Sequence, residues 1–87
     1  MKNVVSCFKP MDKELLKVGL IGMFCEGVMG CKIRIISRTV ENNWLSLELE
    51  NLEPKKENFL PKTFSVGCKL SYKGYVGWSI HPLDERN

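Results

Sequence analysis

The segment 31–38 alternates between apolar and polar residues, which is typical of a strand with one buried face. In this alternation Cys31, Ile33 and Ile35 point into the protein. The residues between and after them share the outer face, and most of them are basic: Lys32, Arg34, Ile36 and Arg38. The segment therefore predicts a half-buried strand with a basic outer face.

A second alternating segment, 44–50, follows after a short polar interval. Its leucines form the inner face, while the outer face combines an aromatic ring with polar and acidic side chains: Trp44, Ser46, Glu48 and Glu50. Asn42 and Asn43 lie between the two segments, and asparagine tolerates the positive φ that tight hairpin turns require. The two segments are therefore predicted to form a hairpin.

The longest alternation, 64–72, places its apolar and aromatic residues on one face: Phe64, Val66, Cys68, Leu70 and Tyr72. Lys73-Gly74 then allows a tight reversal into the segment 75–80, in which Val76, Trp78 and Ile80 face the core. This pattern predicts a second hairpin.

The N-terminal half is less regular. The segment 15–25 is apolar but is interrupted by Gly19 and Gly22, and we expect it to form a strand. Asp12 is a good helix-capping residue and predicts a short helix from Asp12 to Lys17. The polar segment 51–62 contains two prolines, which cannot donate to a central ladder, and it is predicted to be a loop.

Five short strands separated by turns predict a mainly β fold, a small antiparallel five- to six-stranded barrel or sandwich with one short N-terminal helix. A chain of 87 residues is long enough for one core. We therefore expect residues 1–87 to form a single domain, with residues 1–11 as a flexible arm or edge strand and residues 83–87 as a flexible tail.

No apolar run approaches the roughly 18 residues that cross a bilayer, and residues 1–10 lack the apolar core of a secretory signal. These features predict a cytoplasmic protein. Its four cysteines contain no CxxC pair, and there is a single histidine, so the spacing of a zinc site is missing. We expect the cysteines to be reduced and packed in the core: Cys7, Cys25, Cys31 and Cys68. We expect no metal site and no cofactor.

His81 is the only side chain that titrates near neutral pH without help from its surroundings. It precedes Pro82, just past the last predicted strand, where a surface histidine is the simplest interpretation. We therefore expect no catalytic residue, and the protein is predicted not to be an enzyme.

Nucleic acid or nucleotide binding is one alternative, because small barrels bind such ligands with basic and aromatic side chains on one sheet face. Lys32, Arg34 and Arg38 beside Trp44 would suit stacking and phosphate contacts. The net charge of +3 does not require a polyanionic partner. The glutamates of the segment 44–50 favour ion pairs with Lys32 and Arg34 across the hairpin instead.

The sequence Arg34-Ile35-Ile36-Ser37-Arg38 is similar to the RxxxR half of the cyclic di-GMP signature of PilZ domains, which are small β-barrels. The segments 66–70 and 74–78 look like the closing strands of that family, and the likeness covers about half of the chain. The D/N-x-S-x-x-G motif of the family is absent. The resemblance therefore implies a barrel like the PilZ members that do not bind the nucleotide.

Protein binding needs only a sheet edge or an apolar patch with aromatic anchors. Trp44, Tyr75, Trp78 and Phe59 are the candidate anchors, and we expect Trp78 to belong to the core. The leading hypothesis is a small non-catalytic β-barrel binding module, a protein-interaction or regulatory protein. A homodimer through an exposed edge strand, with the segment 15–25 as the candidate, is a further prediction.

The candidate binding residues thus come from both the basic face and the aromatic set: Lys32, Arg34, Arg38, Trp44 and Tyr75.

Overall fold

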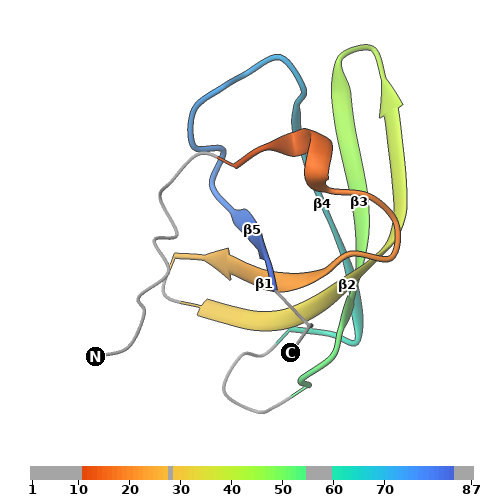
Figure 1. Ribbon diagram of the computed structural model, residues 1–87, viewed down its shortest axis with the longest axis vertical. Coiled ribbons are helices and arrows are strands. Elements are labelled where there is room, and N and C mark those ends of the chain that lie inside the picture. The colour runs from red at the N-terminus through yellow and green to blue at the C-terminus, as the bar shows by residue number, and fades with distance from the viewer. Residues whose placement is uncertain (1–10, 28, 55–59, 84–87) are drawn as a thin grey trace.

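The computed structural model describes residues 11–27, 29–54 and 60–83. A short 3₁₀ helix, η1 (Lys13–Leu15), precedes five antiparallel strands in one sheet of order β4-β3-β2-β1-β5 (Figure 1). The strands are β1 (Ile21–Glu26), β2 (Met29–Glu41), β3 (Trp44–Asn51), β4 (Thr63–Lys69) and β5 (Ser79–Pro82). The predicted mainly β architecture is confirmed, as an open sheet with β4 and β5 at its edges.

The predictions for the N-terminal arm, for the tail and for Phe59 concern residues 1–10, 84–87 and 55–59, which lie outside the described residues. The same holds for Cys7.

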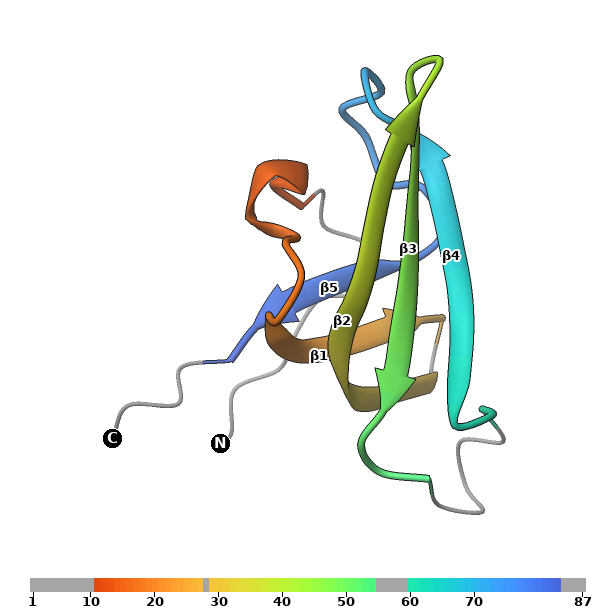
Figure 2. The same cartoon turned by 90° about the vertical axis from the view of Figure 1, so that its right-hand side faces the viewer.

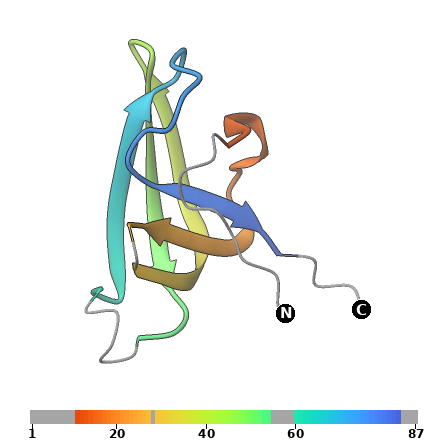
Figure 3. The same cartoon turned by 90° about the vertical axis from the view of Figure 1, so that its left-hand side faces the viewer.

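The sheet bends along β2, its longest strand. The first part of β2 pairs with β1 and the remainder with β3, and the register shifts between Ile35 and Ser37, so that Ile36 is an extra residue. Such a β-bulge bends the strand and increases its twist. As a result β1 and β5 cross the direction of β3 and β4, and the inner faces of the two halves enclose one core (Figures 2 and 3).

The core lies where these two halves meet. The ring of Phe24 on β1 is 5.1 Å from that of Phe64 on β4 and stacks at 6.3 Å on Trp78. The predicted inner residues of the first hairpin are all buried, as is Trp78: Cys31, Ile33, Ile35, Leu45, Leu47 and Leu49. The predictions of an inner face on each strand and of a core tryptophan are confirmed.

Two local predictions are also confirmed. Asn42 and Asn43 both have positive φ, 54° and 64°, and connect β2 to β3 as a two-residue turn. Asp12 caps η1, because its Oδ1 accepts a hydrogen bond from the Glu14 amide at 3.0 Å. The helix is shorter than predicted, ending at Leu15 rather than Lys17.

The predicted strand over 15–25 begins later, at Ile21, because the chain turns at Gly19, whose φ is 98°. The prediction that this segment is an edge strand was wrong. β1 lies between β2 and β5 and pairs with both of them.

The prediction of a second hairpin was also wrong. β5 pairs with β1, not with β4, and the chain between Leu70 and Trp78 crosses from one edge of the sheet to the other as a loop. Hydrogen bonds hold this loop against the barrel: the Leu70 amide donates to Asn43 O at 2.7 Å and Trp78 Nε1 to Gly67 O at 3.2 Å. Lys73-Gly74 therefore lies within a longer connection.

Asn51 anchors the predicted loop over 51–62, which contains no strand in its described part beyond Asn51 itself. This buried side chain donates from Nδ2 to Leu60 O at 3.2 Å and accepts at Oδ1 from the Glu53 amide at 2.8 Å. We expect Asn51→Ala to lower the free energy of unfolding by about 2 kcal/mol, because it removes both hydrogen bonds from a buried site. Urea denaturation measures the effect, and an unchanged midpoint would contradict it.

Candidate functional site

The bulge at Ile36 divides the predicted basic face. After the bulge Ser37 pairs with Glu48, on the outer face, while Arg38 pairs with the buried Leu47. Paired residues of antiparallel strands share a face, so Arg38 points to the inner side of the sheet and Arg34 to the outer side. The prediction that Lys32, Arg34 and Arg38 share one face was wrong.

On the outer face the arginine is paired. Arg34 Nη1 lies 3.6 Å from Glu50 Oε1 of the neighbouring strand, which confirms the predicted cross-strand ion pair for this residue. Lys32 forms no ion pair among the described residues, but its amide donates to Glu53 Oε1 at 3.2 Å. The two basic residues therefore share their surface with carboxylates, and a phosphate backbone would meet negative charge there.

Trp44 and Tyr75 do come together. They line a groove of about 460 Å³ together with Tyr72, Val76 and the β4 residues Gly67, Cys68 and Lys69, and we call this set the aromatic groove. Its residues come from the start of β3, the end of β4 and the loop that follows. Among the described residues, no acidic side chain lines it.

Gly67 positions the indole of Trp44. A Cβ at Gly67 would lie only 2.7 to 2.9 Å from Nε1, Cε2 and Cζ2 of that ring. The ring therefore lies directly on the β4 backbone, and half of its surface remains exposed. The absence of a side chain at Gly67 makes the flat aromatic wall of the groove possible.

The groove adjoins the open edge of β4. The hydrogen bonds from Leu70 N to Asn43 O and from Asn51 N to Lys62 O show that even-numbered residues of this region bond to β3. The odd-numbered residues therefore direct their backbone groups outward. Trp78 Nε1 donates to Gly67 O and Tyr72 N donates to Lys69 O, so these two outward carbonyl groups are already bonded. The backbone groups of the β4 edge that remain open are therefore centred on Ser65. No described strand pairs with it.

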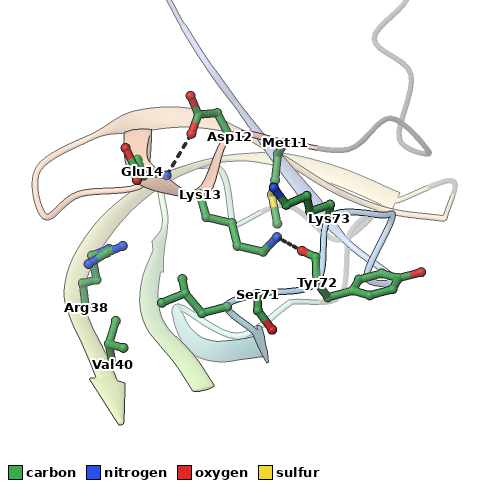
Figure 4. Close-up of a pocket in the computed structure, with 10 residues that line it drawn as sticks. Met11, Asp12, Lys13, Glu14, Arg38, Val40, Ser71, Tyr72 and Lys73 are labelled. Atoms are coloured by element: carbon green, nitrogen blue, oxygen red, sulfur yellow. Dashed lines mark hydrogen bonds between the residues drawn. The ribbon is translucent and has the colours of Figure 1, made fainter. Parts of the chain in front are cut away.

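Arg38 lines a second hollow of about 550 Å³ between η1, the end of β2 and the loop after β4, which we call the Arg38 pocket (Figure 4). Lys13 Nζ donates to Tyr72 O across it, and Asn43 holds Ser71 with bonds of 2.8 and 3.1 Å. The Nε of Arg38 is buried and has no hydrogen-bond partner among the described residues. The other polar residues that line the Arg38 pocket are Asp12, Lys13, Glu14, Ser71, Tyr72 and Lys73.

We expect Arg38→Met to raise the free energy of unfolding by about 1 kcal/mol, because methionine keeps an apolar stem and removes a buried donor without a partner. Urea denaturation of the two proteins measures the difference. Arg34→Met is the matched control on the exposed outer face, and its effect should stay within about 0.5 kcal/mol. A loss of stability in Arg38→Met would show that the guanidinium is well satisfied.

The remaining reactive groups offer little for catalysis. His81 Nε2 lies 3.0 Å from Ser79 Oγ, but Ser79 is fully buried, so a substrate would not reach this hydroxyl. Burial raises the pKa of the Cys31 and Cys68 thiols, and Glu53 raises that of Cys31 further while Lys13 lowers that of Cys68. Both thiols therefore stay protonated and weakly nucleophilic at neutral pH.

Residues 11–27, 29–54 and 60–83 contain no group of three or more potential metal ligands. Among the same residues no helix has the length and apolar character needed to cross a membrane. No known protein family, curated protein or solved structure matches this chain.

Sequence reasoning missed several members of these sites, including Tyr72, Lys69 and Gly67 of the aromatic groove. Tyr72 was expected on the inner face, but it lies past the end of β4 and is about half exposed, where it lines both the aromatic groove and the Arg38 pocket. Lys69 and Gly67 were not singled out. The signal for Gly67 was a glycine at an outward position of an otherwise regular strand, which indicates close approach by another group.

Proposed function

We propose that this protein is a small non-catalytic binding module that holds an extended segment of a partner protein in the aromatic groove. The observation that carries this proposal is the position of Trp44, half exposed and lying flat on Gly67, beside the open edge of β4. Large aromatic side chains in a formed hollow are the typical anchors of protein interfaces.

An extended segment fits this surface better than a helix or a globular face. The open backbone around Ser65 offers donors and acceptors to an added strand, and the groove beyond it accepts the side chains of that strand. Lys69 is the charged residue of the lining. Charge complementarity therefore favours a segment that carries an acidic residue near the aromatic anchor and no basic one.

The nucleotide alternative has less support. It depends on Arg34 and Arg38 acting together, and these residues lie on opposite faces of β2. Arg34 is paired with Glu50. Calorimetry with cyclic di-GMP tests this alternative directly, and we expect no heat of binding.

A second copy of the chain is the other occupant that the β4 edge accepts, as in the predicted homodimer. We favour a different protein because, in an isologous antiparallel contact centred on Ser65, Lys69 would lie opposite Pro61 of the other copy and would gain no acidic partner. Light scattering separates the two cases, and we expect the mass of a monomer.

We place the protein in the cytoplasm. Two of its cysteines, Cys31 and Cys68, are buried and form no disulfide. Unpaired thiols of this kind suit a reducing compartment.

The proposal is tested by selecting binders from a random peptide library against the purified protein and measuring the affinity of the best peptide. We expect Trp44→Ala to weaken that peptide at least about tenfold, equivalent to ~1.4 kcal/mol. Val18→Ala removes an equally exposed apolar side chain away from the groove, so it should leave the affinity unchanged.

Amide chemical shifts in the same titration locate the peptide. Perturbations over Ser65, Gly67 and Tyr75 are expected. A peptide that binds equally well to Trp44→Ala, or that perturbs only residues away from the groove, would refute the proposal.

A further inference from the structure

Arg38 occupies an unusual place for an arginine, because it lies on the inner face of β2. Earlier positions on this face carry the buried residues Ile33 and Ile35. The extra residue at Ile36 turns it inward. There it lies near the end of β2, where η1 and the loop after β4 form the walls of the Arg38 pocket (Figure 4). A cation in this position sits partly out of water, where its desolvation is unfavourable unless a partner binds it.

The described part of the chain supplies no such partner. Arg38 takes part in no ion pair there, and its buried Nε has no acceptor. Two acidic residues line the pocket, and Oδ1 of Asp12 is already engaged with the Glu14 amide at the cap of η1. The carboxylate of Glu14 does not come within ion-pair distance of the guanidinium.

Other polar groups face the same hollow. The oxygen of Ser71 accepts from Asn43 Nδ2, which leaves its hydroxyl hydrogen available to an incoming acceptor. Lys13 is held by its bond to Tyr72 O, and Lys73 lines the pocket beside it. The pocket thus presents donors from three separate elements, and the Asn43 bonds fix one of them in place.

We propose that the Arg38 pocket binds a carboxylate group. The two terminal nitrogens of the Arg38 guanidinium, Nη1 and Nη2, form a planar pair of donors that matches the two oxygens of a carboxylate. This inference is independent of the aromatic groove, although Tyr72 borders both hollows.

The charge of the lining selects a carboxylate over a phosphate. Lys13, Arg38 and Lys73 are positive, while Asp12 and Glu14 are negative, which leaves one net positive charge. A single carboxylate balances that charge. A phosphate dianion would exceed it and would meet repulsion from both acidic side chains.

Sodium acetate is the probe, with the Arg38 Nε–Hε signal in ¹⁵N spectra as the readout at constant pH and ionic strength. We expect a saturable shift of this signal, accompanied by the amides of Ser71 and Lys73. Arg38→Gln should abolish the shifts at Ser71 and Lys73. Arg34→Gln, which changes the paired arginine of the outer face, should leave the titration unchanged.

Inorganic phosphate and chloride are titrated in parallel. Tighter binding of phosphate than of acetate would overturn the choice of a carboxylate. A linear shift that chloride reproduces, or a response that survives in Arg38→Gln, would overturn the site itself. A second readout is thermal: acetate should raise the melting temperature of the wild type but not that of Arg38→Met, and an equal rise in both would count against the pocket.

Discussion

Phe24→Ala is expected to lower the free energy of unfolding by about 4 kcal/mol, the largest effect of any single change considered. Phe24 is 1% exposed and lies on β1, between β2 and β5. Its ring contacts Phe64 from β4 and stacks on Trp78, which precedes β5. Truncation therefore leaves a cavity between the two halves of the barrel, and backbone hydrogen bonds on both sides of β1 limit its collapse.

Urea denaturation followed by circular dichroism measures this loss. Leu15→Ala is the control, because the side chain of Leu15 is about half exposed and its removal should cost less than about 0.5 kcal/mol. Similar midpoints for the two variants would mean that the aromatic cluster is not the centre of the core.

Gly22→Ala is expected to lower the free energy of unfolding by about 3 kcal/mol. Gly22 is buried in β1, and a Cβ there would lie 2.8 Å from the carbonyl oxygen of His81 and 3.1 Å from Cγ2 of Ile80. The first of these neighbours is backbone in the paired strand, so it cannot rotate away as a side chain would. β5 would have to move off β1.

Thermal or urea denaturation again gives the magnitude, and the amide signals of β5 report where the strain appears. Ser65→Ala is the matched control, a change to alanine at an exposed position of an edge strand. If Gly22→Ala unfolds at the same point as this control, the contact between β1 and β5 is looser than the structure indicates.

The period-two pattern was sufficient to predict the inner face of β3 and that of β2 as far as Ile35. Burial of one face fixes which residues alternate inward, and the register cannot slip without exposing all of them. The turn at Asn42-Asn43 followed from the backbone freedom of asparagine. These features depend on neighbours in sequence, which is why the sequence alone reveals them.

The bulge could not be read from the same pattern. Extending the alternation through Ile36 put Arg38 on the outer face, whereas one additional residue reverses every position that follows. The adjacent pair Ile35-Ile36 was the sole local sign of this break. Through that single residue Arg38, one of the three basic residues of the predicted face, turned to the inner side of the sheet and lines the Arg38 pocket.

The pairing of β5 was equally hidden, because it depends on distant parts of the chain. Lys73-Gly74 has the composition of a tight turn, but Trp78 and Ile80 are needed in the core beside β1. Burying them outweighs the local turn preference. Trp44 and Tyr75 were both chosen from the sequence as candidate binding residues, but their meeting beside the β4 edge depends on this long connection.

The pairing of β5 with β1 also affects synthesis of the protein. Phe24 emerges from the ribosome early, while its partner Ile80 emerges after every other strand. Until then β1 has one unsatisfied side, and the stacking surface that Trp78 covers is bare. The edge of β1 that faces β5 therefore stays unpaired until β5 has been made, and an unpaired strand edge of this kind is prone to aggregation.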